Sequence, residues 1–320
     1  MGDRSQSINQ PNEPVLQPEG QGLRWGICGL GRAGTARLKS IWSTEGQFGQ
    51  VHAIATRRPE VIERQLIEKP QGHVSPSILN NWEALMTAPI DALFICSENA
   101  LHGDQVESAL NANLHVCVEF PLCTEPHRAS VLFDLARSKS CILHVEHIGL
   151  LSDAFITIQT QVNRQPSPVH IEVDFTGAYY RWVQSENLAG RAGHLCIGRL
   201  QQLQHLLGTL TLESVQYSTH ATGYELKITL MGKRGKATLK DTRHISLTRR
   251  TQWFLSSPEE PRTPIPLPKQ QSSLFLKDLE SVHKEICHHQ LPYLNSNEVC
   301  HVMDIADKIN EFCLLNHNES

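Results

Sequence analysis

A glycine-rich turn at residues 29–34 constrains the fold of this 320-residue chain more than any other feature. The turn reads GLGRAG, follows the apolar run 24–28 and precedes the helix-length segment 33–43. In a G-x-G-x-x-G turn the glycines allow a tight bend, close approach of phosphate to the backbone and close packing of helix on strand. A purely structural turn is the alternative, but the flanking strand and helix favour dinucleotide binding. The residues expected to hold the dinucleotide are Gly29, Gly31, Arg32, Ala33 and Gly34.

Short apolar runs alternate with amphipathic segments from residue 23 to about residue 147. This alternation is typical of βαβ units and predicts a parallel sheet covered by helices. The predicted strands are 24–28, 51–56, 92–96, 115–120 and 142–145, and the predicted helices are 33–43, 101–111 and 125–139.

After about residue 150 the pattern changes to alternating apolar and polar positions, which predicts a mostly antiparallel sheet. Two apolar stripes with helical spacing, Phe275 to Ile286 and Val299 to Cys313, predict closing helices. The predicted strands of this half are 169–175, 213–218, 224–231 and 236–240.

We therefore predict the fold class α/β, with a Rossmann domain over residues 22–147 and an α+β domain with the closing helices over residues 148–320. Residues 1–21 are polar and proline-containing, so a disordered tail is expected there. The segment 258–268 is rich in proline and is predicted to be an exposed loop.

Composition excludes several classes of function. The formal net charge is −4 and no block of five like charges occurs, which argues against a nucleic-acid partner. The nine cysteines form no C-x-x-C pair and lie mostly in apolar runs, which is typical of reduced thiols in the cytosol. No apolar run is long enough to span a bilayer, and no apolar core follows a basic start. We expect a cytoplasmic protein with no membrane partner.

The end of the second strand sets the expected cofactor. An acidic residue there would bind the ribose 2′-hydroxyl of NAD, but the sequence reads Thr56-Arg57-Arg58. A guanidinium is well matched to the 2′-phosphate of NADP. NADP(H) is therefore preferred and NADH remains possible, with two solvated surface arginines as the alternative interpretation.

Further motifs resemble those of the biliverdin reductase family, a branch of the Gfo/Idh/MocA-type oxidoreductases. They are GLGRAGTAR at 29–37, Thr56-Arg57-Arg58, ICSE at 95–98 with His102, HVCVEFP at 115–121 and LHVEH at 143–147. The resemblance extends over about residues 23 to 315 and is looser between residues 150 and 270. It implies that the α+β domain is built on a large open sheet. It also implies that Ser97, Glu98, His102, Glu119 and Phe120 contact the cofactor.

The loop after the fifth strand departs from the wider superfamily. There a Glu-Lys-Pro sequence supplies a lysine for sugar or polyol oxidation, whereas this chain has Glu119-Phe120-Pro121. Gly198 stands where those enzymes carry a histidine. The resemblance therefore disfavours sugar oxidation. Biliverdin reductases have Tyr where this chain has Phe120, so an aromatic ring is kept and a phenolic proton is lost.

The reaction implied by the resemblance is hydride transfer from NADPH to the central methine carbon of biliverdin, which gives bilirubin in heme catabolism. Arg199 matches a family arginine that binds the bilin and helps proton delivery; a structural salt bridge is the alternative. Glu119 and His147 are the other catalytic candidates, and His147 is expected to titrate near neutral pH. The expected substrate contacts are Phe120, Glu146, Arg181 and Arg199.

Three alternatives stay open. A hydrogen-bonded histidine without a catalytic role is the other interpretation of His147, and a core aromatic cluster is the other interpretation of the segment around Arg181. A non-catalytic NADP(H)-binding regulator on the same fold is the alternative function. Some family members bind metal near His301 and Cys313, but Val302 and Leu314 replace two thiols here, so no metal site is predicted.

Overall fold

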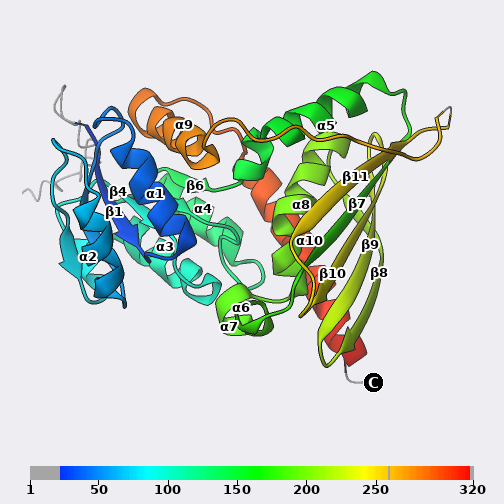
Figure 1. The fold of residues 1–320 in the computed structure, drawn as a ribbon, viewed down its shortest axis with the longest axis horizontal. Coiled ribbons are helices and arrows are strands. Elements are labelled where there is room, and N and C mark those ends of the chain that lie inside the picture. The colour runs from blue at the N-terminus through cyan, green and yellow to red at the C-terminus, as the bar shows by residue number, and fades with distance from the viewer. Residues whose placement is uncertain (1–21, 259, 318–320) are drawn as a thin grey trace, which may run out of the picture.

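The computed structural model describes residues 22–258 and 260–317 and builds them around two six-stranded sheets (Figure 1). The predicted tail at 1–21 lies outside the described residues. All neighbouring strands of the first sheet pair in parallel, in the order β3-β2-β1-β4-β5-β6. This is a doubly wound Rossmann order, in which ligands bind beyond the carboxyl ends of the strands where the order reverses, beside β1 and β4. Its strands are β1 (Arg24–Cys28), β2 (Gln50–Ala55), β3 (Ser77–Leu79), β4 (Ala92–Ile95), β5 (His115–Val118) and β6 (Leu143–Val145).

Helices cover both faces of the first sheet, as βαβ connections require. Leu38 and Ile41 of α1 and Ile62 of α2 share one core cluster, whereas Val106 of α3 and Leu132 of α4 belong to another. The helices are α1 (Arg32–Trp42), α2 (Pro59–Ile67), α3 (His102–Asn111) and α4 (Arg128–Ser138), with short 3₁₀ turns at Glu83–Thr87, Asn99–Leu101 and Ile148–Leu151.

The second sheet has the order β12-β11-β7-β10-β9-β8 and is antiparallel except where β10 runs parallel to β7. The predicted mostly antiparallel sheet is therefore confirmed. Its strands are β7 (Val169–Ala178), β8 (Thr211–His220), β9 (Gly223–Gly232), β10 (Gly235–His244), β11 (Arg250–Ser256) and β12 (Thr263–Pro264). The last of these pairs with β11, so the segment predicted as a loop contains a two-residue strand.

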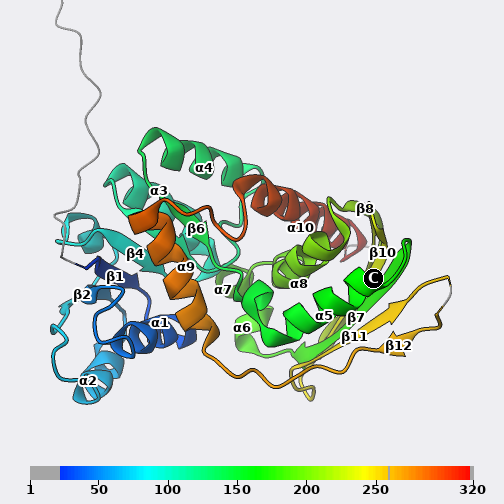
Figure 2. The same ribbon diagram turned by 90° about the horizontal axis from the view of Figure 1, so that it is seen from above.

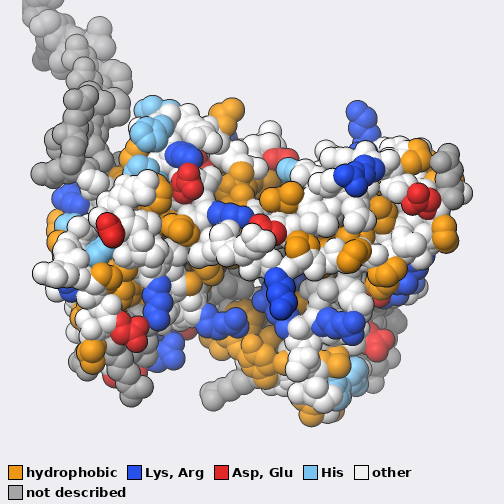
Figure 3. Space-filling model, turned by 45° about the horizontal axis from the view of Figure 1, so that its top comes forward, with side chains coloured by type: hydrophobic (Ala, Val, Ile, Leu, Met, Phe, Trp, Pro, Cys, Tyr) orange, Lys and Arg blue, Asp and Glu red, His pale blue; other side chains and the backbone are white. Residues whose placement is uncertain are grey.

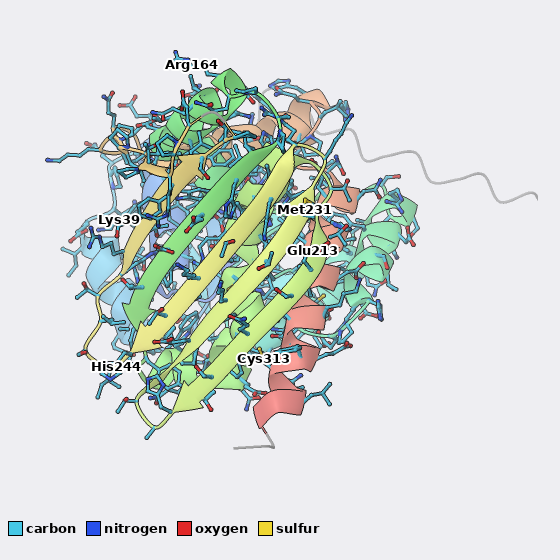
Figure 4. All side chains as sticks on the ribbon, turned by 90° about the vertical axis from the view of Figure 1, so that its right-hand side faces the viewer. Lys39, Arg164, Glu213, Met231, His244 and Cys313 are labelled. Atoms are coloured by element: carbon cyan, nitrogen blue, oxygen red, sulfur yellow. The ribbon has the colours of Figure 1, made fainter. Side chains whose placement is uncertain are left out.

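Helices cover one face of the second sheet and leave the other open. Figure 1 places these helices between the two sheets, and Figure 4 looks onto the open face, with Met231 and His244 toward opposite ends of the strands. Along β7 buried positions alternate with half-buried ones, which matches a strand covered on one side only. The helices of this half are α5 (Asp153–Arg164), α6 (Arg181–Gln184), α7 (Glu186–Ala189), α8 (Ala192–Leu207) and α10 (Ser296–His317).

One closing helix does not pack where the sequence pattern placed it. The helix α9 (Leu274–His288) was predicted within the second domain, but it lies beside α1 on the first sheet (Figure 2). Leu279 and Val282 of α9 are buried in the same cluster as Leu38 and Trp25. Periodicity predicts a buried face but does not specify which sheet that face meets. The domain boundary at residue 147 remains a prediction.

All predicted strands and helices are present, and the pattern missed β3, β11, β12, α2, α5, α6, α7 and α8. The nine cysteines are free thiols. Within the described residues, no helix combines the length and the apolar character that crossing a bilayer requires.

We expect Leu279→Ala to lower the free energy of unfolding by about 2–5 kcal/mol, because it leaves a cavity between α9 and the first sheet. Leu279 is 1% exposed, whereas Leu291, just beyond α9, is 85% exposed. Leu291→Ala is therefore the matched control, with a change within about 0.5 kcal/mol. Urea unfolding measures both. Equal effects of the two substitutions would contradict the packing of α9 on the first sheet.

Candidate active site

The turn between β1 and α1 has the geometry of a dinucleotide cradle. Gly29 has φ +88°, and a side chain there would lie 2.7 Å from the carbonyl oxygen of Cys96. A side chain at Gly34 would lie 2.0 Å from the carbonyl oxygen of Gly29, so helix and turn touch here. Gly31 faces open space and caps α1 without any side-chain hydrogen bond. The first N–H groups of α1 are thus left for an anion, and these residues fit a pyrophosphate.

The arginine at the end of β2 has an unexpected partner. Arg57 forms an ion pair with Glu98, which follows β4 on the other side of β1. The side chain of Arg57 is 79% exposed and that of Glu98 is 22% exposed. Thr56 is buried and its hydroxyl accepts a hydrogen bond from the backbone N–H of Arg58 at 3.1 Å, which shapes the turn after β2.

His102 does not lie where the resemblance implied. Its ring is fully buried and lies 2.7 Å from the carbonyl oxygen of Pro121 and 3.3 Å from that of Ser97. The hydroxyl of Ser97 donates a hydrogen bond to Gln105 at 2.6 Å. His102 therefore ties the loop after β4 to the loop after β5, and the expected direct cofactor contact is wrong for this residue because the ring has no exposed surface.

Two aromatic rings and a glycine meet at the carboxyl edge of the first sheet. Phe120 follows β5 and stacks on His147, which follows β6, with ring centroids 5.3 Å apart and planes 6° from parallel. A side chain at Gly198 of α8 would lie 3.1 Å from Cζ of Phe120. The ring of Phe120 therefore packs closely over Gly198, and a larger residue at position 198 would require the ring to shift. First and second domains meet at this contact.

Beneath these rings lies a pair of carboxyl groups. Glu119 accepts hydrogen bonds from Arg37 at 3.1 and 3.3 Å and is hydrogen-bonded to Glu146. A hydrogen bond between two carboxyl groups requires that one of them carries a proton. Burial and the neighbouring Glu119 raise the pKa of Glu146 well above its usual range, so Glu146 holds that proton. Glu146 is 1% exposed, which contradicts the predicted substrate contact.

His147 is neutral in the folded protein. Burial and the nearby positive charge of His144 lower its pKa to about 3. Its Nδ1 is buried without a hydrogen-bond partner among the described residues, and its backbone N–H donates to the hydroxyl of Tyr293 at 2.9 Å. The expectation that His147 titrates near neutral pH is therefore wrong.

A buried guanidinium holds the carboxyl pair in place. Arg37 of α1 is 1% exposed, pairs with Asp278 of α9 at 2.5 Å and with Glu119 at 3.1 Å, and lies over two aromatic rings. Those rings are Phe94 and Phe275, about 5 Å from Cζ of Arg37. No motif singled out Arg37 as a functional residue. The available signal was a charged residue on the apolar face of the first helix, beside Leu38 and Ile41.

The same aspartate binds a second cation. Asp278 lies 3.0 Å from Nε2 of His144 and accepts a hydrogen bond from Tyr293 at 2.7 Å, while Nδ1 of His144 lies 2.8 Å from Glu285. Despite burial, these carboxylates raise the pKa of His144 to about 10, and the cations hold the pKa of Asp278 far below its usual range. His144, Asp278 and Cys117 are close enough to hold a metal, but the ion pairs already account for His144 and Asp278.

Arginines dominate the second domain's side of the site. Arg199 of α8 binds Asp241 at 2.5 Å, and its Cζ lies 4.0 Å from the ring centre of Phe175. Arg243 binds the same aspartate at 2.8 Å and packs on the same ring. Desolvation and the guanidiniums of Arg199, Arg32 and Arg243 lower the pKa of Arg249.

We call this group of cations the arginine cluster (Arg32, Arg199, Arg243 and Arg249). Its positive charges outnumber the negative charge of the carboxylate paired with it. Asp241 pairs with Arg199 and Arg243, and no ion pair joins Arg249 to any carboxylate of residues 22–258 or 260–317. Figure 3 shows Lys and Arg side chains along the hollow between the two halves of the molecule. An anion bound there would relieve the repulsion among these groups.

Two further residues from the sequence are the predicted substrate contact Arg181 and His301, where no metal site is predicted. The side chain of Arg181, at the start of α6, lies outside the described part of the structure. His301 on α10 lies with Nε2 2.7 Å from the carbonyl oxygen of Leu210.

A Rossmann sheet with a dinucleotide turn, followed by a second, mixed sheet, is typical of a class of NAD(P)-dependent oxidoreductases. Residues 23–147 match the Gfo/Idh/MocA model, described as an oxidoreductase family with an NAD-binding Rossmann fold. The Rossmann part of this chain is therefore similar to that family, over less than half of the chain's length. The resemblance stated from the motifs is thereby confirmed.

Two curated relatives are biliverdin reductase A proteins. The human protein is 29% identical over 136 residues, which span 42% of this chain and 43% of the relative. The mouse protein is 24% identical over 304 residues, which span 90% of this chain and 95% of the relative.

Solved structures share the whole fold. The biliverdin reductase of Synechocystis, in complex with biliverdin and NADP⁺, has a TM-score of 0.77 at 20% identity and covers 91% of this chain and 99% of its own. The scyllo-inositol dehydrogenase of Lactobacillus casei has a TM-score of 0.75 at 16% identity and covers 92% and 97%. At these identities the likeness shows the fold alone.

We expect His144→Gln to lower the free energy of unfolding near pH 6 by about 3–5 kcal/mol, because Asp278 and Glu285 lose a buried partner. The pKa of His144 is raised to about 10 in the folded protein, against about 6.5 in an unfolded chain. Its stabilisation is therefore complete below about pH 6.5 and is lost as the pH rises toward 10. Urea unfolding across this range should show a flatter pH profile for the variant.

The matched control is His288→Gln at the exposed end of α9. This control should reproduce the pH profile of the wild type. Parallel profiles for wild type and His144→Gln would contradict the charged state assigned to His144.

Proposed function

We propose that this protein reduces biliverdin, or a related linear tetrapyrrole, with NADPH as hydride donor. The observation that carries the proposal is the contact between Phe120 and Gly198. Where the polyol-oxidising members of the superfamily have a lysine and a histidine, this chain has an aromatic ring packed over a bare glycine. The site thus lacks a relay for alcohol oxidation and gains a flat apolar wall. The names of the curated relatives and of the Synechocystis complex support the same substrate.

The shape and charge of the site suit a planar dianion. Biliverdin is a flat conjugated molecule with two propionate groups. Phe120 is half-buried and is backed by the buried, neutral His147 stacked on it, so its ring offers a surface against which a conjugated ring system can pack. The arginine cluster, whose Arg199 follows Gly198 on α8, supplies guanidiniums for carboxylates.

Reduction requires a hydride and a proton: biliverdin, NADPH and one proton give bilirubin and NADP⁺. When bound, the cofactor supplies the hydride that goes to the central methine carbon. The chain has to bind the tetrapyrrole, exclude water and deliver the proton to a pyrrole nitrogen. Arg199 provides positive charge near the reacting system and can relay a proton from water. Its high intrinsic pKa makes it a poor acid on its own.

The carboxyl pair is the other source of a proton. Glu119 and Glu146 share one proton beneath Phe120, and the side chain of Glu119 is 18% exposed while Glu146 is buried. Glu119 would therefore face the nicotinamide side of the cleft, with Glu146 behind it. His147, neutral and stacked, acts as part of the wall in this proposal.

The cofactor part of the proposal rests on Arg57 and Arg58, which follow β2 where the 2′-phosphate of NADP would lie. The dinucleotide turn supplies the pyrophosphate site through Gly29, Gly31 and Gly34.

The decisive experiment mixes pure protein with NADPH and biliverdin. Loss of NADPH absorbance together with growth of the bilirubin band supports the proposal. Binding of NADPH without turnover would favour the non-catalytic regulator, and turnover of inositol in place of biliverdin would contradict the substrate assignment.

We expect Gly198→Ala to reduce biliverdin turnover by about tenfold, because the added methyl group lies 3.1 Å from Cζ of Phe120 and displaces the ring. Alanine is a better helix former than glycine, so the variant should unfold at the same or a higher urea concentration. Phe120→Tyr is the matched control: it restores the usual family residue and should hold or raise turnover. Unchanged turnover in Gly198→Ala would show that Phe120 does not line the substrate site.

We expect Arg199→Ala to reduce single-turnover reduction by about 10²-fold while the Kd for NADPH stays unchanged, because the residue lies on α8 of the second domain. Arg243 keeps Asp241 paired, so the fold should persist. Arg199→Lys keeps the charge and should restore part of the rate. Arg250→Ala on the exposed end of β11 is the control. An unchanged rate and an unchanged Kd for bilin would make Arg199 a structural salt-bridge residue.

A further inference from the structure

The ion pair between Arg57 and Glu98 places opposite charges at one point of the dinucleotide site. In NAD-dependent Rossmann domains an acidic residue at the end of the second strand binds the ribose 2′-hydroxyl. This chain has no acidic residue there. The fold instead brings one from the neighbouring loop, because β1 separates β2 from β4 and the carboxyl ends of all three strands lie at the same edge.

The carboxylate is the fixed member of the pair. The loop that carries Glu98 is anchored on both sides: Ser97 donates a hydrogen bond to Gln105 at 2.6 Å, and Asn99 donates one to the carbonyl oxygen of Ala189 at 2.8 Å. The backbone carbonyl of Glu98 also accepts a hydrogen bond from Leu101 at 2.9 Å.

The guanidinium is the mobile member. The side chain of Arg57 is 79% exposed, and within the described residues its one ion pair is with Glu98. A long exposed side chain can change partners at small cost, since an exposed ion pair is weak. Arg57 can therefore turn from Glu98 toward another anion that binds at the same edge.

We propose that Glu98 and Arg57 form a two-way selector for the ribose 2′-position of the cofactor. With NADH, Glu98 accepts a hydrogen bond from the 2′-hydroxyl and Arg57 stays paired with Glu98. With NADPH, Arg57 leaves Glu98 and pairs with the 2′-phosphate. This inference deepens the cofactor part of the proposed function and rests on that part.

The charge of Glu98 determines whether it weakens or strengthens the binding of each cofactor. The carboxylate of Glu98 repels a 2′-phosphate and competes with it for Arg57, so Glu98 opposes NADPH. The same carboxylate is an acceptor for a hydroxyl, so Glu98 supports NADH. A chain with Arg57 and without Glu98 would therefore discriminate more strongly in favour of NADPH than this one does.

The test measures the Kd of each cofactor by calorimetry, without bilin. In Glu98→Gln we expect NADPH to bind about three- to tenfold tighter and NADH to bind more weakly. In Arg57→Gln we expect NADPH to bind about tenfold or more weakly, with little change for NADH. In the double variant the gain for NADPH should disappear, because Glu98 acts on the phosphate largely through Arg57.

Glu68→Gln, which removes an exposed carboxylate on the same domain, is the matched control and should change neither Kd. Equal changes for NADH and NADPH in Glu98→Gln, or no change in either, would overturn the selector. Wild-type protein that binds neither cofactor would overturn it together with the cofactor proposal. Wild-type protein that binds both, shows the predicted shifts and leaves biliverdin unreduced would support the selector and overturn only the substrate proposal.

Discussion

The structure depends on the buried guanidinium of Arg37. A charged group with almost no exposed surface must be paired, because an unpaired buried charge is strongly destabilising. Its partners come from distant parts of the chain: Glu119 from the loop after β5 and Asp278 from α9. The first domain therefore reaches its final form only when a helix from the end of the chain has closed on it. The loop that carries Phe120 is positioned by the same contact.

Charge balance around Arg37 explains the states of the groups near the site. Arg37 and the protonated His144 carry positive charge, and Asp278 and Glu285 balance them. A further buried cation so close would be unfavourable, and His147 is accordingly neutral. Glu119 and Glu146 together carry one negative charge and one proton. The carboxyl pair can thus release or accept a proton while the rest of the network keeps its charges.

Sequence reasoning predicted the elements well and the contacts between them poorly. The glycine turn and the apolar runs of the first half depend on local spacing, so β1, α1 and the order of a Rossmann unit could be read directly. The placement of α9 could not be predicted, because an apolar stripe shows that a helix face is buried but does not specify the element against which it packs. The parallel pairing of β7 with β10 is similarly a long-range property that alternation along each strand leaves open.

The candidate site shows the same division. Its individual residues followed from motifs and from the resemblance, whereas its chemistry depends on pairs far apart in sequence, such as Arg37 with Asp278, Arg57 with Glu98 and Phe120 with Gly198. The burial of several side chains also contradicts the roles that the sequence predicted for them. Glu146 and His147 follow β6 at the expected strand end, and His102 begins α3, but all three side chains are buried, so a position near the edge of the sheet did not mean access to a ligand.

The pair Phe120 and Gly198 links the fold to the chemistry. A side chain larger than glycine at position 198 would meet the ring, and a smaller residue at position 120 would leave a gap between the two domains. The two positions are therefore coupled by packing, and a chain that changed only one of them would lose the contact. Replacing a lysine and a histidine together by a ring and a glycine removes two titratable groups from the edge of the sheet. In the proposed reaction the proton must then come from the carboxyl pair below the ring or from water near Arg199, which are the proton sources that remain beside the apolar wall.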